Sequence, residues 1–171
     1  MKRFNVFIIG LLLLSACHSD PPMVIQPSQP GNVDLKEHMI NANRTISRAE
    51  ETSIDEYVSR RGWSMSKLDD GTRLWEYKVG GGRNVEVEDS VTITYDIEAI
   101  NGKPIYNDLQ ETFVAGRRQK LIGLDNAVLH LRYGSCAKVI LPSSVAYGIG
   151  GDGDRIPQSA ILVIDLQIKQ Q

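Results

Sequence analysis

Apolar and polar residues alternate along much of the second half of the chain. In VTITYDIEA, residues 91–99, every second position is apolar, which is typical of a strand that buries one face and exposes the other. The apolar runs AKVILP at 137–142 and ILVIDLQI at 161–168 predict two further strands. In the last of these, one side would carry Leu162, Ile164, Leu166 and Ile168.

Turn signals join these segments into antiparallel pairs. The segment WSMSKLDDGTRLWEYKV at 63–79 predicts two strands about an Asp70-Gly71 turn. Asn101-Gly102 marks a second turn, after which residues 111–115 around Phe113 predict another strand. A sheet with short connections is therefore expected from residue 63 onward.

Helical spacing appears in two places. Leu124, Ala127, Val128 and Leu131 stand at i, i+3, i+4 and i+7, and Gly134 follows where a C-cap glycine is common. Residues 33–61 carry spaced apolar residues among charges, and Ser53 with Glu56 has the form of a capping box. One or two amphipathic helices are expected there, packing on the following domain in preference to pairing with a second copy.

These elements predict an α+β fold: a curved antiparallel β-sheet wrapped around one short helix, preceded by N-terminal helices. The expected organisation is a signal peptide at 1–16, a proline-rich tether at 17–32, a helical extension at 33–62 and the main domain at 63–171.

The first residues have the order of a secretory signal. Lys2 and Arg3 precede an apolar run at 4–14, which is shorter than the roughly 20 residues of a membrane-spanning helix. The sequence LSAC that follows resembles a bacterial lipobox, which implies a lipid on Cys17 and a membrane anchor in the bacterial cell envelope, facing the periplasm. The alternative is an ordinary signal peptide with an incidental cysteine.

Charge and cysteine content bear on two further features, nucleic-acid binding and disulfide bonds. Removing residues 1–16 takes two bases from 19 Lys and Arg against 21 Asp and Glu, which leaves a formal charge of about −4. No basic patch for nucleic acid is indicated. Once Cys17 is lipidated, only Cys136 remains, so no intramolecular disulfide is expected.

The stretch SSVAYGIGGDGDRIP, residues 143–157, contains the spacing G-x-G-x-x-G at Gly148, Gly150 and Gly153. In dinucleotide-binding proteins a helix follows the third glycine and its amides bind phosphate. Here a strand is predicted after it, and Asp152 and Asp154 would repel a phosphate. A glycine-bent loop is expected instead, and no cofactor or metal is expected, because the three histidines lack metal-ligand spacing.

Six pieces in order, VTITYDI, NGKPIY, LIGLDNAV, YGSCAKVILP, VAYGIGG and RIPQSAILVIDLQI, resemble the FKBP-type peptidyl-prolyl cis-trans isomerases over residues 71–170. The lipidated form with an N-terminal helical extension is similar to bacterial lipoproteins of this family, including those grouped with gliding motility. The resemblance implies an isomerase that assists the folding of exported or envelope proteins and binds proline-containing polypeptides.

The resemblance also implies an apolar pocket under the 143–157 loop. The Tyr147 hydroxyl would bond the substrate carbonyl, with Tyr95 as a second catalytic group. The substrate-binding positions would be Ile105, Tyr106, Phe113, Leu121, Leu124, Ile156 and Ile164.

The chain departs from the family at several of these positions. The family usually has a tryptophan at Leu124, aromatic rings at Ile105 and Ile164, and a carboxylate at Tyr106. The alternative function is therefore an FKBP-fold binding module or chaperone with little or no isomerase activity. A homodimer through the N-terminal helices is a further possible partner arrangement.

Overall fold

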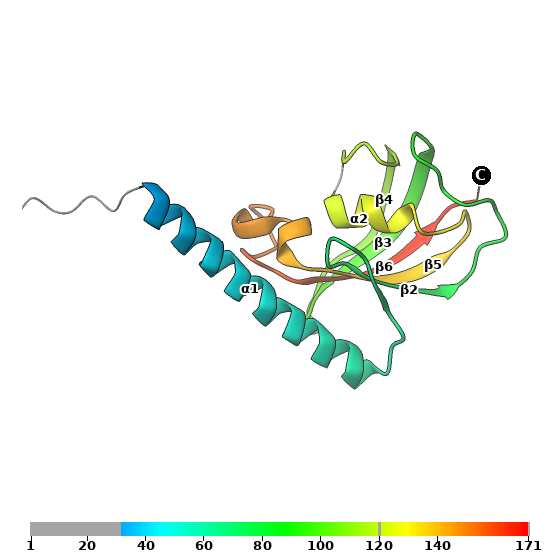
Figure 1. The fold of residues 1–171 in the computed structure, drawn as a ribbon. Helices are drawn as coiled ribbons and strands as arrows, with labels where there is room; N and C mark the ends of the chain where they lie inside the picture. The colour runs from blue at the N-terminus through cyan, green and yellow to red at the C-terminus, as the bar shows by residue number, and fades with distance from the viewer. Residues whose placement is uncertain (1–31, 120, 171) are drawn as a thin grey trace, which may run out of the picture.

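The computed structural model describes residues 32–119 and 121–170. Its centre is one antiparallel sheet of six strands in the order β1-β2-β5-β6-β3-β4 (Figure 1). The strands are β1 (Ser66–Lys67), β2 (Arg73–Lys78), β3 (Ser90–Ala99), β4 (Pro104–Val114), β5 (Cys136–Leu141) and β6 (Leu162–Ile168). The predicted α+β class is confirmed. The signal peptide, Cys17 and nearly all of the tether lie outside the described residues.

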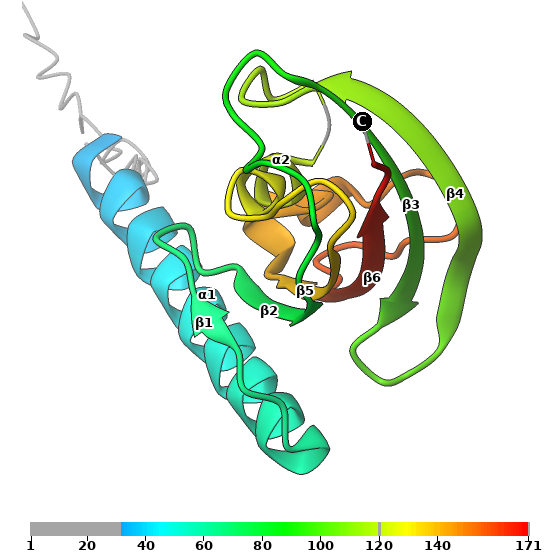
Figure 2. The same cartoon turned by 90° about the vertical axis from the view of Figure 1, so that its right-hand side faces the viewer.

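The sheet curls around the short helix α2 (Ile122–Val128), whereas the long helix α1 (Asn32–Arg61) lies outside the curve (Figure 2). Alternation in β3 buries Val91, Ile93, Tyr95 and Ile97 on the concave side. β6 adds its predicted set of Leu162, Ile164, Leu166 and Ile168, all at most 1% exposed. The main apolar core therefore fills the space between the concave face and α2.

The N-terminal extension is one continuous helix of 30 residues. The expected helix start at Ser53 is wrong: its Oγ donates to the Ala49 carbonyl at 3.0 Å, a bond that a serine inside a helix makes to the preceding turn. α1 ends at Arg61, and Gly62 follows with φ +64°.

The C-terminal part of α1 docks on the convex face of the sheet. Ile54 and Tyr57 are 1% and 4% exposed and form a second apolar cluster with Ile140 of β5 and Val163 of β6. The predicted division between an extension at 33–62 and a domain at 63–171 stays a prediction, since α1 and the sheet share this cluster.

Two expected boundaries change. β4 extends over 11 residues instead of the predicted five, because it pairs with β3 from Pro104 to Val114 despite its polar sequence. α2 ends at Val128 with Leu129 as its C-cap, so Gly134 is not the cap of this helix. Gly134, with φ +85°, lies in the turn before β5, where its N–H donates to the Ile168 carbonyl at 3.1 Å.

Candidate functional site

The predicted pocket residues come together on the concave side of the sheet. β3 supplies Tyr95, β4 supplies Ile105, Tyr106 and Phe113, α2 supplies Leu124, and β6 supplies Ile164. Leu121 precedes α2, and Tyr147 and Ile156 come from the long connection between β5 and β6. All nine belong to, or pack against, the same apolar cluster.

The nine residues differ in exposure in a way that separates floor from rim. Tyr95, Phe113, Leu124, Ile156 and Ile164 are at most 6% exposed and form the floor. Ile105, Tyr106, Leu121 and Tyr147 are partly exposed and form the rim. The hydroxyl-bearing residues Tyr106 and Tyr147 therefore stand where a ligand could reach them.

The connection between β5 and β6 is bent by two short 3-10 turns, η1 (Ser143–Val145) and η2 (Gly148–Gly150). Gly151 has φ +68°, and a Cβ there would lie 2.3 Å from the Ile156 carbonyl oxygen, so only glycine fits. The expectation of a glycine-bent loop in place of a phosphate-binding turn is confirmed, because β6 and not a helix follows it.

Asp152 organises the tip of this loop. Its Oδ1 accepts from the backbone N–H groups of Asp154 at 2.9 Å and Ile156 at 2.8 Å. Its Oδ2 accepts from the Tyr106 hydroxyl at 2.6 Å, which joins β4 to the loop across the rim. This bond is the main reason that the pKa of Asp152 is lowered to about 2 and that the pKa of Tyr106 rises to about 12.

Arg155 covers the same bridge from outside. Its guanidinium lies 5.2 Å from the centre of the Tyr106 ring, a cation–π geometry, and 3.7 Å from the Asp154 carboxylate. Its Nη1 donates to the Ile105 carbonyl at 3.5 Å. The rim of the site is thus closed on this side by polar contacts between β4 and the loop.

The two tyrosines expected to be catalytic remain protonated well above neutral pH. Burial is the main cause that raises the pKa of Tyr95, and the negative charge of the nearby Glu111 adds to it. Burial also raises the pKa of Tyr147, with the nearby charges of Asp152 and Glu111 adding to the effect. Both side chains can therefore act as hydrogen-bond donors but not as bases.

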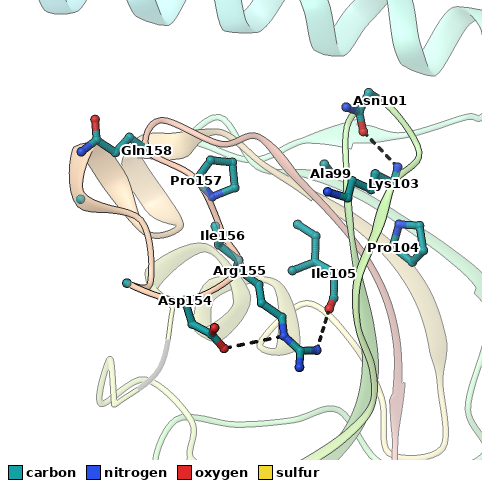
Figure 3. A pocket seen from close by; sticks show the side chains of 12 residues that line it. Ala99, Asn101, Lys103, Pro104, Ile105, Asp154, Arg155, Ile156, Pro157 and Gln158 are labelled. Carbon is teal, nitrogen blue, oxygen red and sulfur yellow. Dashed lines mark hydrogen bonds and ion pairs between the residues drawn. The ribbon is translucent and has the colours of Figure 1, made fainter.

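An open cavity of about 670 Å³ lies beside the apolar cluster, between the β3–β4 turn and the end of the loop (Figure 3). Of the nine predicted site residues, only Ile105 and Ile156 line it. The other lining residues are mostly polar or small, among them Asn101, Lys103 and Gln158. The cavity therefore adjoins the apolar cluster that holds the nine predicted site residues and does not coincide with it.

Sequence reasoning missed Glu111, Asp152 and Arg155 as members of the site. The signal for Asp152 is its place in GDGD, where an aspartate commonly accepts bonds from backbone N–H groups two or more residues later. Glu111 lies opposite Ile93 in the β3–β4 register, a position that only the pairing of the strands reveals.

The described residues contain no group of three or more His, Cys, Asp or Glu placed to hold a metal ion. Among the helices described, none is both long enough and apolar enough to cross a membrane.

The fold and site define a small curved-sheet protein with an apolar cluster on its concave side, and comparison with known proteins identifies its family. A model of the family "FKBP-type peptidyl-prolyl cis-trans isomerase" matches residues 81–169. The chain belongs to this family. The match covers β3 to β6 and α2 but neither α1 nor β2.

Curated relatives agree with this assignment. The chain is 28% identical over 107 residues to FK506-binding protein 4 of Dictyostelium discoideum. The aligned region covers 61% of this chain and 29% of that protein. It is 31% identical over 84 residues to FK506-binding protein 2 of the same organism, covering 47% and 63%. The chain thus spans less than a third of the length of the first of these relatives.

Solved structures share the fold. A peptidyl-prolyl cis-trans isomerase from Pseudomonas syringae superposes with a TM-score of 0.62 at 23% identity, covering 74% of this chain and 92% of that one. AtFKBP13 superposes with a TM-score of 0.57 at 22% identity, covering 61% and 95%. The expected FKBP-like architecture is confirmed.

Proposed function

We propose that the protein is a peptidyl-prolyl cis-trans isomerase that acts on proline-containing polypeptides. The observation that carries the proposal is a protonated, half-buried Tyr147 hydroxyl at the rim of an apolar cluster made of Tyr95, Phe113, Leu124 and Ile164. Family membership supports the same activity.

This arrangement suits rotation about an X-Pro bond, which requires no nucleophile. The planar peptide is separated from its isomer by a barrier of about 18–20 kcal/mol. In the twisted state the amide loses resonance, so apolar contact with the proline ring and well-placed hydrogen bonds can favour it over the planar state. An acceleration of ten-thousand-fold needs about 5.5 kcal/mol of such selective stabilisation.

The test is the cis-trans exchange rate of an X-Pro test peptide with wild type and with Tyr147→Phe. The loss of one neutral hydrogen bond costs about 0.5–1.5 kcal/mol, so kcat/KM should fall about 2- to 12-fold. The unfolding midpoint should change little. Unchanged activity in Tyr147→Phe would remove this hydroxyl from the mechanism.

A folded wild type that binds the peptide without accelerating its exchange would favour the second candidate, a binding module or chaperone. The specific observation behind that candidate is Leu124, a small side chain at the floor where the family usually presents a larger ring. Binding and exchange measured on one peptide sample separate the two functions.

The proposed setting is the bacterial cell envelope, with the protein anchored by lipid on Cys17 and facing the periplasm. The support is the sequence LLSAC after a basic start. Labelling of cells with a fatty-acid probe should mark the wild type and not Cys17→Ser. Equal labelling of both, or a wild type that does not partition with membranes, would contradict the anchor.

We also propose that the N-terminal part of α1 pairs with a second copy. Its exposed apolar side chains Leu35, Met39 and Ile46 follow one another at intervals of four and seven residues, as in a helix-pairing stripe. Sedimentation of the wild type should give a dimer, and Met39→Glu a monomer. A monomeric wild type at high concentration would contradict the pairing.

A further inference from the structure

The loop that carries Tyr147, Asp152 and Ile156 begins with the short turn η1 directly after β5. A turn of this kind leaves its first N–H groups without partners inside the turn. The residue at the cap position is Pro142, which makes no side-chain hydrogen bond to the turn. Ser143 is 6% exposed, so water is largely kept from its N–H, and a buried N–H needs a partner.

Glu50 of α1 supplies this partner. Its Oε2 accepts from the Ser143 N–H at 3.0 Å, and its Oε1 accepts from the Ser143 hydroxyl at 2.5 Å. Both carboxylate oxygens thus hold one residue, and the negative charge lies at the end of the turn where N–H groups point outward. A side chain 93 positions away takes the place of the cap that Pro142 cannot provide.

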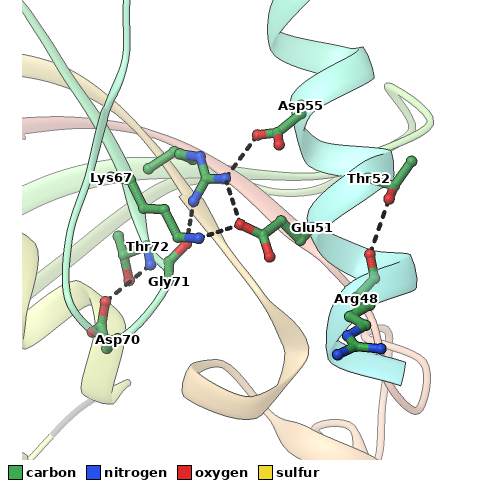
Figure 4. Close-up of polar contacts among 9 residues, drawn as sticks. Arg48, Glu51, Thr52, Asp55, Lys67, Asp70, Gly71 and Thr72 are labelled. Carbon is green, nitrogen blue, oxygen red and sulfur yellow. Dashed lines mark hydrogen bonds and ion pairs between the residues drawn. The ribbon is translucent and has the colours of Figure 1, made fainter. Parts of the chain in front are cut away.

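Glu50 is itself held in place by the docking of α1. It precedes Ile54 by one helical turn, so the two side chains project from the same face, and Ile54 is 1% exposed against the sheet. Polar contacts add to this anchorage (Figure 4): Asp55 accepts from the buried Arg73 guanidinium at 2.7 Å, and Glu51 pairs with Lys67. The carboxylate therefore has a fixed position relative to the sheet.

The hydrogen bonds and packing of η1 connect the position of Ser143 to that of Tyr147. The Val145 N–H donates to the Pro142 carbonyl at 3.2 Å, and the Ala146 N–H donates to the Ser143 carbonyl at 3.1 Å. Val145 and Ala146 pack on the apolar cluster, and Tyr147 follows immediately. A displacement of Ser143 would therefore also displace the Tyr147 hydroxyl, which in the proposed function donates a hydrogen bond to the substrate.

We propose that Glu50 is a positioning residue for the isomerase site, acting through Ser143 and η1 on Tyr147; this rests on the proposed function. α1 then contributes to the site through the loop, although it lies outside the residues that match the family. A small misplacement of a group that bonds the transition state can reduce the rate strongly.

The test compares Glu50→Gln with Glu56→Gln in the full chain. Glu56 lies on the same helix, is exposed, and in the described part of the chain its ion-pair partner is Arg60 at 3.7 Å, so it matches the change in charge. We expect kcat/KM for an X-Pro peptide to fall about 2- to 12-fold in Glu50→Gln, no more than in Tyr147→Phe, and less than twofold in Glu56→Gln, with both variants folded. An equal, small effect in both would overturn the proposal.

A second arm asks whether the effect passes through Tyr147. In a Tyr147→Phe background, Glu50→Gln should reduce kcat/KM less than twofold further, since the hydroxyl it positions is gone. A merely structural role would give the full loss in both backgrounds, and that result would also overturn the proposal.

A third arm needs no turnover. Amide hydrogen exchange at residues 143–147 should speed up at least fivefold in Glu50→Gln and not in Glu56→Gln. If the wild type does not accelerate cis-trans exchange of the peptide, the proposed function fails. The rate of amide hydrogen exchange still decides whether Glu50 holds the loop. Unchanged amide exchange at these residues would contradict the positioning role by itself.

Discussion

The two faces of the sheet are both covered by a helix, but they are held in different ways. On the concave face, α2 and the inward side chains of β3 and β6 form one continuous apolar core that includes the floor of the candidate site. On the convex face, α1 contributes chiefly Ile54 and Tyr57 to a small cluster, and acidic side chains bind Ser143, Lys67 and Arg73.

Neighbouring residues on the same strands serve the two faces. In β5, Val139 belongs to the concave core while Ile140 faces α1, and in β6 Ile164 and Val163 divide in the same way. The concave face therefore supplies the apolar environment of the site, whereas the convex face fixes the position of α1. Stability and positioning are assigned to opposite sides of one sheet.

The largest expected effect is the loss of a concave core side chain. Leu124→Ala should lower the free energy of unfolding by about 2–5 kcal/mol, because Leu124 is 1% exposed and its removal leaves a cavity among packed neighbours. Denaturant unfolding measures this. The control is Ile122→Ala on the same helix, where the side chain is 43% exposed and the change should stay within about 0.5 kcal/mol.

On the convex face, Ile54→Ala should cost less, about 2 kcal/mol, because its cluster is small and is bordered by partly exposed side chains that can move into the space. Ile46→Ala, 47% exposed on the same helix, is the matched control and should have little effect on the monomer. A loss at Ile54 as large as that at Leu124 would show that both faces belong to one equally cooperative core.

The sequence predicted the concave face well, because strict alternation in 91–99 and the spacing of Leu124, Ala127 and Val128 are local signals. It did not assign Val163 and Ile140 to a second cluster. Their burial depends on α1, which is distant in sequence, although the unbroken apolar run at 161–164 is typical of a strand covered on both faces.

The incorrect boundaries have physical reasons as well. The sequence of β4 is polar because it is an edge strand whose outer side meets solvent, so alternation alone revealed only its end at Phe113. Leu131 continues the helical spacing past Val128, but it lies beyond the end of α2, where it is still buried. The bridge from Tyr106 to Asp152 joins residues 46 positions apart, and local patterns contain no information about it.

The smallest expected effect concerns this bridge: it compares how a variant on each face of the sheet changes the dependence of stability on acid pH. The pKa of Asp152 is lowered from 3.8 to about 2, first of all by the Tyr106 hydroxyl. The folded protein therefore binds this proton more weakly than the unfolded chain does. The resulting stabilisation is complete above about pH 4 and is lost as the pH falls toward about 2.

In Tyr106→Phe the main cause of the lowered pKa is absent, while the N–H groups of Asp154 and Ile156 still donate to Asp152. The decrease in unfolding midpoint between pH 4 and pH 2 should therefore be smaller than in the wild type, though not abolished.

Asp89, whose pKa is also about 2 because of Arg83, contributes equally to both proteins and cancels in the difference. Tyr57→Phe is the control on the convex face, since the buried Tyr57 hydroxyl has no hydrogen-bond partner among the described residues and should leave the acid dependence unchanged. Parallel acid curves for wild type and Tyr106→Phe would mean that the bridge across the rim does not hold in solution.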